Sequence, residues 1–426
     1  MEIAEKSSGN VYSWVILGNL FMAQLVMSMG AYVWGPLAPF VREAFNVSRS
    51  QIGVISSALY VTATVIAIPS GILVDKFGAR IMLMISLIIM GGAFVLMALV
   101  PQLDGIVLCS AVSGLGYGII NQVSTKGIMC WFAARTRGTA MGIKQTGVTL
   151  GGAVSAVLMP TVVAAFSLKF GFFAVGCSLL LTALASFALY KERPSAGVFS
   201  VNANPGKREH ASLAAVISNP ELITVMLIFP LMCFIQIGIM TFLVLYLTED
   251  LRFPVGTAGS LLATVMVAGA AGRVGWGGIS DRLLGGNRLK ALFLSALIGA
   301  ISIFCLAVIS DNAPVYVYFI LSAFLGFNLV GWNAVILIYI AELVGTRRAG
   351  SVVGVAITIG YMGLISGPIV FGYVVDHCSY FAGWMMLSSI ALMSTLGYFY
   401  LLTRFSDERK TAPETVCSVS GSSGPR

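Results

Sequence analysis

The chain has 426 residues, of which 58% are hydrophobic and only 10% are charged, and its formal net charge is +8. Its mean hydropathy of +0.93 excludes a soluble protein, because a soluble fold cannot accommodate that much apolar side chain. The composition therefore indicates a membrane-embedded protein, and the excess of positive charge has to be explained by membrane topology.

Apolar runs long enough to cross a bilayer follow one another along the whole chain. A membrane helix needs about 20 predominantly apolar residues, and the first run is too long for a cleavable signal peptide. The sequence predicts twelve spans, at 13–38, 51–74, 80–101, 105–131, 139–165, 170–190, 220–247, 257–279, 289–310, 315–341, 349–375 and 380–403. The expected fold is an all-α membrane protein with twelve transmembrane helices.

Matching motifs indicate that the chain consists of two related halves. The second span ends with Gly71-Ile-Leu-Val-Asp75 and the eighth with Gly277-Gly-Ile-Ser-Asp281, each followed by a basic residue. The predicted organisation is a cytoplasmic amino terminus at 1–12, pseudo-symmetric six-helix halves at 13–190 and 219–403, a cytoplasmic linker at 191–218, and a cytoplasmic tail at 404–426.

The distribution of basic residues predicts the orientation. If the amino terminus is inside, the outer loops hold Arg42, Arg49, Lys169 and Arg252, the spans hold Lys126, Lys144 and Arg273, and the rest of the 25 lie on the inner side. This asymmetry follows the positive-inside rule and explains the net charge without a nucleic-acid partner. We expect a multi-pass protein of the cell inner (plasma) membrane with both termini in the cytoplasm.

Two loop motifs resemble those of a known family. Asp75-Lys-Phe-Gly-Ala-Arg80, its second copy at Asp281, and Trp131-Phe-Ala-Ala-Arg-Thr-Arg137 resemble the major facilitator superfamily of secondary transporters, and the resemblance covers nearly the whole chain. It implies that the first, fourth, seventh and tenth helices line a central cavity. It also implies that the second, fifth, eighth and eleventh join the halves, which rock to give alternating access.

The charged loop residues are candidates for gating. Asp75 and Asp281 lie where they are expected to cap a neighbouring helix or to pair with Arg80, Arg137 or Arg282. Such contacts would exist only while the cytoplasmic side is closed. The alternative is that these charges only set the topology of the loops.

Arg273 and Lys144 are the candidate ligands of a substrate. Arg273 lies eight residues before Asp281, which places it about 12 Å from the cytoplasmic end of its helix, and Lys144 lies about 9 Å from the end of the fifth helix. Arginine stays charged, and its cost at bilayer depth is about 3 to more than 10 kcal/mol, so it should face water or an anion. We expect the two cations to clamp one carboxylate from opposite halves.

Less specific interpretations of these cations remain open. Arg273 would then brace the helices, and Lys144 would extend its ammonium to the inner interface. Lys126, five residues before Trp131, is expected to extend in this way.

A second resemblance concerns the eighth helix. Arg273-Val-Gly-Trp276 and the residues up to Asp281 are similar to oxalate/formate antiporters and, more loosely, to monocarboxylate carriers, where the corresponding arginine binds the substrate carboxylate. The oxalate antiporters have a second cation at the position that is Ala356 here. This departure argues against oxalate as the substrate, and Lys144 is our candidate for the missing charge.

Neutral polar side chains in three spans would complete the site. Residue pairs four apart share a helix face, and the candidates are Tyr117 with Asn121, Asn328 with Trp332, and Gln24 with Ser28 and Tyr32. They suit a substrate with hydroxyl or carbonyl groups. The alternative is hydrogen bonding between helices without a ligand.

The spans contain cations but no carboxylate near their middle, which favours an anionic substrate. We expect a monomeric secondary active transporter of a small organic anion, a mono- or dicarboxylate, acting by alternating access as an exchanger or as a proton-coupled symporter. Efflux of drugs or lipophilic cations and transport of inorganic anions such as nitrate are the alternatives. We expect no enzyme activity, no catalytic residues, no cofactor and no metal site.

Overall fold

The computed structural model describes residues 11–100, 102–192, 219–309, 313–344 and 349–411, all of which belong to helices or to their short connections. Most of the predicted amino terminus (1–12), linker (191–218) and tail (404–426) lies outside these residues. The helices are α1 (Val11–Ala31), α2 (Trp34–Phe45), α3 (Arg49–Phe77), α4 (Ala79–Leu99), α5 (Leu103–Trp131), α6 (Ala134–Ala165), α7 (Leu168–Leu189), α9 (Pro220–Glu249), α10 (Val255–Arg282), α11 (Arg288–Val308), α12 (Val315–Leu329), α13 (Trp332–Val344), α14 (Ala349–His377) and α15 (Tyr380–Thr411).

By length and composition these helices provide 12 candidate membrane spans, as predicted. Two spans are broken into two helices each. The first consists of α1 and α2, which are interrupted at Tyr32 and Val33, and the tenth consists of α12 and α13, which are interrupted at Val330 and Gly331. The apolar runs are continuous through both breaks, so the sequence predicted one unbroken helix in each case.

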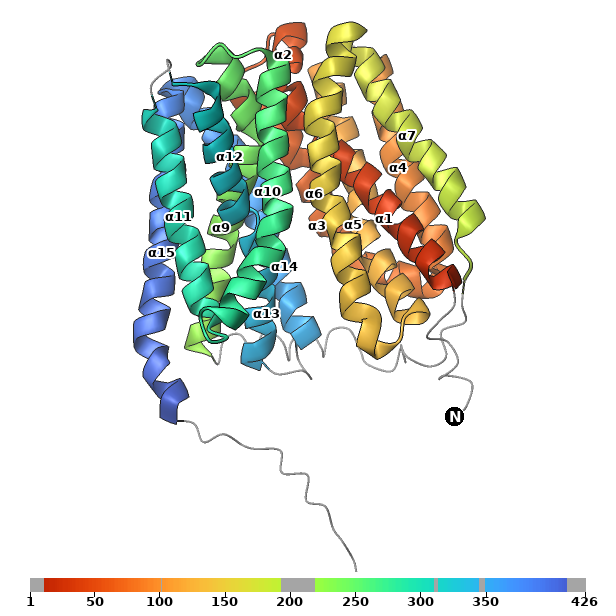
Figure 1. The fold of residues 1–426 in the computed structure, drawn as a ribbon. Helices are drawn as coiled ribbons and strands as arrows, with labels where there is room; N and C mark the ends of the chain where they lie inside the picture. Colours follow the sequence, from red (N-terminus) through yellow and green to blue (C-terminus); the bar gives the residue numbers. More distant parts are fainter. Residues whose placement is uncertain (1–10, 101, 193–218, 310–312, 345–348, 412–426) are drawn as a thin grey trace, which may run out of the picture.

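The helices pack as two sets with the same internal arrangement (Figure 1). In the first set α3 packs against α5, α4 against α7 and α1 against α6; in the second set α10 packs against α12, α11 against α15 and α9 against α14. These are equivalent pairs when the spans of each set are numbered in order. The repeat confirms the predicted all-α fold with two pseudo-symmetric six-helix halves.

The two halves meet along three helix pairs, α3 with α14, α6 with α10 and α2 with α9. Glycine permits backbone contact at these crossings. A Cβ atom on Gly53 would collide with the carbonyl oxygen of Pro368, and one on Gly259 would collide with that of Ala156. Because both pairs join opposite halves, the crossings hold the halves together through close helix packing.

The two ends of the bundle differ. We call the end that carries Arg49, at the start of α3, the Arg49 end, and the opposite end, where α3 finishes, the Asp75 end. The close crossings at Gly53 and Gly259 lie towards the Arg49 end, whereas a Cβ atom on Gly142 or Gly354, near the Asp75 end of α6 and α14, would meet nothing within 4 Å. Figure 1 shows the same trend, with the two sets of ribbons closer together at the top than at the bottom.

Candidate functional site

Lys144 is buried in the middle of the molecule. Its side chain belongs to α6 and its relative exposure is 2%. Its ammonium donates to Asn121 Oδ1 of α5 at 2.9 Å and lies 3.5 Å from Gln145 Oε1. This position argues against a lysine that extends to the membrane surface, because the ammonium is bonded to neutral amide oxygens inside the protein.

Arg273 reaches the same place from the other half. Its Nη1 donates to the carbonyl oxygen of Gln145 at 3.3 Å, which links α10 to α6. Its Nε is buried and has no hydrogen-bond partner in the described part of the chain. Gln145 therefore contacts both cations, although sequence reasoning did not select it; its position directly after Lys144 was the available signal.

The two cations have no counter-charge in the described part of the chain. Neither Lys144 nor Arg273 forms an ion pair with a described carboxylate, and Gln145 contacts both side chains. Asn121 and Gln145 are exposed although both lie within candidate spans. Exposed amides are unfavourable in lipid, so we expect this electropositive part of the interface to open to solvent.

Tyrosines lie near Arg273. Tyr32, at the break between α1 and α2, interacts with Arg273 and, through its hydroxyl, with Tyr117. The Tyr117 ring packs edge-on against Tyr60, with the centroids 6.4 Å apart, and Tyr60 lies at the same distance from Tyr361 of the other half. Tyr60 and Tyr361 were not predicted, since single tyrosines in apolar spans carry no pattern that distinguishes them from packing residues.

The other predicted neutral ligands make local contacts. Gln24 donates to Ser28 at 3.2 Å. Asn328 donates to the carbonyl oxygen of Phe324 at 2.8 Å, and Trp332 Nε1 donates to that of Leu329 at 3.1 Å, next to the break between α12 and α13. The side-chain oxygens of Gln24 and Asn328 are buried without a hydrogen-bond partner. The side-chain oxygens of these two amides are thus available to accept a hydrogen bond from a ligand or a water molecule. The Trp332 indole instead satisfies a carbonyl oxygen beside the break.

The predicted gating residues pair within their own halves. Asp75 forms an ion pair with Lys126 at 3.0 Å, and Lys126 also donates to the carbonyl oxygen of Val74 at 2.8 Å. Lys126 is 8% exposed, and its ammonium extends to the last turn of α3, where the Asp75 carboxylate is its partner. Arg80 donates to the carbonyl oxygen of Phe187 rather than to Asp75.

The second copy of the motif behaves in the same way. Asp281 pairs with Arg288, which also contacts Glu342 at 3.3 Å. Arg137 donates to two carbonyl oxygens near the end of α5, and Arg282 is exposed. These partners differ from those that the sequence suggested, and the ion pairs of Asp75 and Asp281 do not cross between the halves.

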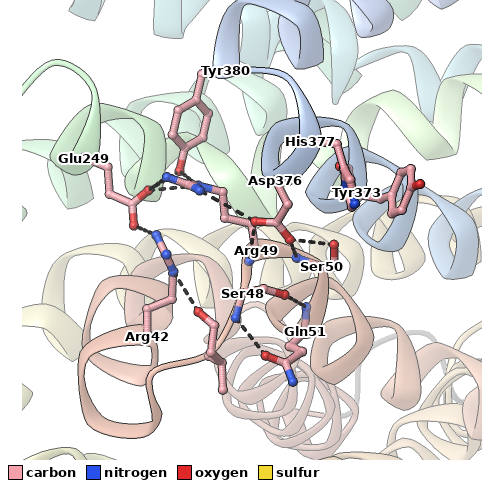
Figure 2. Close-up of polar contacts among 11 residues, drawn as sticks. Arg42, Ser48, Arg49, Ser50, Gln51, Glu249, Tyr373, Asp376, His377 and Tyr380 are labelled. Atoms are coloured by element: carbon pink, nitrogen blue, oxygen red, sulfur yellow. Dashed lines mark hydrogen bonds and ion pairs between the residues drawn. The ribbon is translucent and has the colours of Figure 1, made fainter.

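A polar cluster at the Arg49 end does cross between the halves, and the sequence analysis treated its members only as loop charges (Figure 2). Arg42 and Arg49 of the first half both pair with Glu249 of the second. Tyr380 also donates to Glu249, at 2.7 Å, and Asp376 accepts from the backbone N–H of Arg49 at 3.0 Å. The cluster fastens the halves together at this end.

Twelve candidate membrane spans in two six-helix halves, with one cation from each half between them, are typical of a membrane transporter. The description "Major Facilitator Superfamily" belongs to a family model that matches residues 20–368. The chain belongs to this family, and it is a transporter rather than an enzyme. The expected family and fold are thereby confirmed.

Individual relatives are distant. The chain is 22% identical over 391 residues to the hexuronate transporter of Bacillus subtilis, covering 88% of this chain and 92% of that protein. It is 27% identical over 421 residues to the probable sulfoacetate transporter SauU of Cupriavidus necator, covering 93% of this chain and 96% of that protein. The structure of a bacterial homologue of the human lysosomal transporter Spinster, inward-facing and unoccupied, has a TM-score of 0.79 at 14% identity, over 94% of this chain and 99% of that chain. That likeness concerns the fold.

Proposed function

We propose that the protein is a secondary active transporter of a small organic anion with one or two acid groups, and that Arg273 and Lys144 bind the acid group from opposite halves. The observation that carries this proposal is the buried Nε of Arg273, which has no hydrogen-bond partner among the described residues. Neither Arg273 nor Lys144 pairs with a described carboxylate. A guanidinium in this state offers a fork that matches a carboxylate or a sulfonate.

The neutral groups around the cations support a hydroxylated or bifunctional substrate. Tyr32 and Tyr117 bring hydroxyls to Arg273, and Asn121 and Gln145 bring amides to Lys144. A hexuronate carries several hydroxyls and one carboxylate, and sulfoacetate carries two acid groups. The relatives named for these compounds therefore have substrates that this donor set suits.

The orientation follows from the basic residues. We propose that the Asp75 end faces the cytoplasm, in the cell inner membrane with both termini inside, because the positive-inside rule favours it. The site lies between two halves of one chain, so a monomer is sufficient for transport. We also propose that the predicted gating residues exchange their present partners when the Asp75 end closes. These residues are Asp75, Arg80, Arg137, Asp281 and Arg282.

Neither Lys144 nor Arg273 pairs with a described carboxylate, and this favours anion exchange over coupling to protons. Moving an empty site through an occluded state would bury two unpaired cations, each costing several kcal/mol. Bound anion removes most of that cost, so the loaded protein should change state faster than the empty one. Proton symport is the second form of the proposal, and it requires a group such as Lys144 to gain its proton together with the substrate.

A thermal-shift panel on the purified protein tests the substrate class. Ligands that bind the folded state raise the melting temperature. D-glucuronate or sulfoacetate should stabilise the wild type. In Arg273→Gln the affinity obtained from the concentration dependence of this shift should be at least about tenfold weaker, since a charge-assisted contact is lost. Lys169→Gln, which removes an exposed cation, is the matched control.

Two outcomes would contradict the proposal. Stabilisation of the wild type by tetraphenylphosphonium but by no anion would favour efflux of lipophilic cations, and an unchanged response in Arg273→Gln would make this arginine a structural brace. Counterflow of the stabilising anion in proteoliposomes, without a pH gradient, then tests exchange. Uptake that occurs only with an imposed pH gradient would replace exchange by proton symport.

A further inference from the structure

We propose that Arg42, Arg49 and the amino end of α3 form a second anion-binding site, which takes the acid group of the incoming substrate when the Arg49 end opens. We call these groups the outer anion site. In the present state it is filled by Glu249 and Asp376 of the second half. The inference rests on the proposed function, because it assigns an entry step to the same organic anion.

The first carboxylate position is formed by two guanidinium groups. Arg42 Nη1 pairs with Glu249 Oε1, and Arg49 donates to Glu249 Oε2 from Nη2 at 2.7 Å and from Nε at 3.0 Å. Both arginines thus converge on the two oxygens of one carboxylate (Figure 2). This is the planar recognition that arginine provides for carboxylate ligands, and Glu249 stands where a substrate acid group would bind.

The second carboxylate position lies at the amino end of α3. Asp376 accepts from the backbone N–H of Arg49 at 3.0 Å and of Ser50 at 2.8 Å, and from the Ser50 hydroxyl at 2.6 Å. Free N–H groups at a helix start and the helix dipole both favour an anion there. The outer anion site therefore holds two carboxylates side by side.

The donors of the outer anion site belong to the first half, which itself positions Arg42 and the start of α3. The Arg49 guanidinium is oriented here by Glu249, Asp376 and Tyr380 of the second half. Arg42 Nε donates to the carbonyl oxygen of Val47 at 3.0 Å, which orients its guanidinium. The start of α3 is held by a capping box, in which Gln51 N donates to Ser48 and Ser48 N donates to the Gln51 side chain. When the halves separate at this end, the donors should stay together and lose both carboxylates at once.

The released charges are accessible to a ligand. The Arg42 and Arg49 side chains are already 26% and 25% exposed in the closed cluster. Separation of the halves would leave two guanidiniums unpaired on the rim, facing the carboxylates Glu249 and Asp376 across the entrance. An incoming anion would be attracted to the first half and repelled by the second, which gives the rim a defined docking side.

A simple latch and a binding site make opposite predictions for the two partners of one ion pair. If the cluster only fastens the halves, Arg49→Gln and Glu249→Gln break the same contact and should change uptake in the same direction. If Glu249 competes with the substrate for Arg49, removing Glu249 frees the site, whereas removing Arg49 destroys it.

The experiment measures the external concentration of D-glucuronate, and separately of sulfoacetate, at which uptake into cells is half-maximal. Arg42→Gln and Arg49→Gln should raise it about tenfold, and Glu249→Gln should lower it about twofold to fivefold. The wild-type value should rise with ionic strength, and this rise should be smaller in the two arginine variants. Lys169→Gln, an exposed cation on the same side in the proposed orientation, is the control.

Shifts in the same direction for Arg49→Gln and Glu249→Gln would overturn the inference and leave a latch. Folding and the central site are monitored by the thermal shift with the same anions. The affinity obtained from this shift should change by no more than about twofold in Arg49→Gln, because the closed rim is not in contact with the central site. A wild type that neither binds nor takes up either anion would instead contradict the proposed function.

Discussion

The Arg49 end and the Asp75 end use charged residues in different ways. At the Arg49 end Glu249 of the second half pairs with Arg42 and Arg49 of the first. At the Asp75 end, Asp75 pairs with Lys126 in its own half, and Asp281 pairs with Arg288 in its own half. Ion pairs between the halves therefore close the Arg49 end. At the Asp75 end, Asp75 and Asp281 instead have their partners within their own half.

This difference indicates which contacts change during transport. Packing within each half is apolar and extensive, as for α3 with α5 and α11 with α15, so it should persist. We expect the polar contacts between the halves to change instead, because water solvates the charged groups at the rim when the halves separate. The central cations Lys144 and Arg273 lie between the two ends, and one comes from each half.

A cross-link at the closed end should have the largest effect. The hydroxyl oxygens of Ser56 on α3 and Thr241 on α9 are 3.4 Å apart, across the two halves. Cysteines at both positions should form a disulfide under oxidation. We expect oxidation to abolish transport and reduction to restore it, while substrate affinity in detergent stays within about threefold because the central site remains assembled.

The two single cysteine variants, oxidised in the same way, are the controls for this cross-link. Transport by the oxidised double variant at the wild-type rate would show that the Arg49 end does not have to open.

Asp75→Asn should have the next largest effect. The substitution removes the negative charge that pairs with Lys126. We propose that this charge takes a different partner when the Asp75 end closes. Loss of one charge-assisted contact corresponds to about 1.5 kcal/mol, or about a tenfold slower transport rate. Substrate affinity should stay within a few fold in a thermal-shift titration; a loss of binding would exclude a gating role.

Asp376→Asn should shift the balance between the two ends by a smaller amount. The carboxylate caps α3 from the opposite half, and loss of such a cap costs about 1 kcal/mol. The Arg49 end should therefore open about fivefold more often. The measurement is the labelling rate of Ser56→Cys, which is 2% exposed in the closed state, by an impermeant maleimide. An unchanged rate would show that the cap does not stabilise closure.

Alanine substitutions at two glycines should have effects of opposite sign, and the effect at Gly142 should be the smallest. In Gly53→Ala the new methyl would collide with the Pro368 carbonyl oxygen and weaken closure of the Arg49 end. In Gly142→Ala the methyl would meet nothing within 4 Å, so helix propensity should stabilise the protein by about 0.5–1 kcal/mol. Thermal unfolding separates the two, and a lower melting temperature for Gly142→Ala would show that this surface is packed.

The fold was predictable because its signal is local and periodic. Runs of apolar residues locate the spans, and the copies of the motif at Asp75 and Asp281 indicate two halves. The breaks at Tyr32 and Gly331 were missed because the residues around them are as apolar as the rest of the span. At the second break the chain passes close to the neighbouring helix, since a Cβ atom on Gly331 would collide with the backbone of Gly272.

The site was predictable only in part. Arg273 and Lys144 stand out because a charge within a span is costly, and this cost can be inferred from composition alone. The other contacts join positions far apart in the sequence. Examples are the contact of Arg273 with Gln145, the ion pair of Lys126 with Asp75, and the cluster around Glu249. Arg49 and Glu249, for example, are separated by 200 residues, and their pairing requires the relative position of the halves, which no single sequence supplies.

The most direct test of the central claim is a double-mutant cycle on substrate affinity. Binding of the anion selected by the thermal-shift panel is measured for the wild type, Arg273→Gln, Lys144→Gln and the double variant. If both cations hold one acid group, each single substitution removes most of the shared interaction, and the coupling should be about 1–3 kcal/mol. Strictly additive losses would contradict the account, because they would mean that the two halves do not bind the same group.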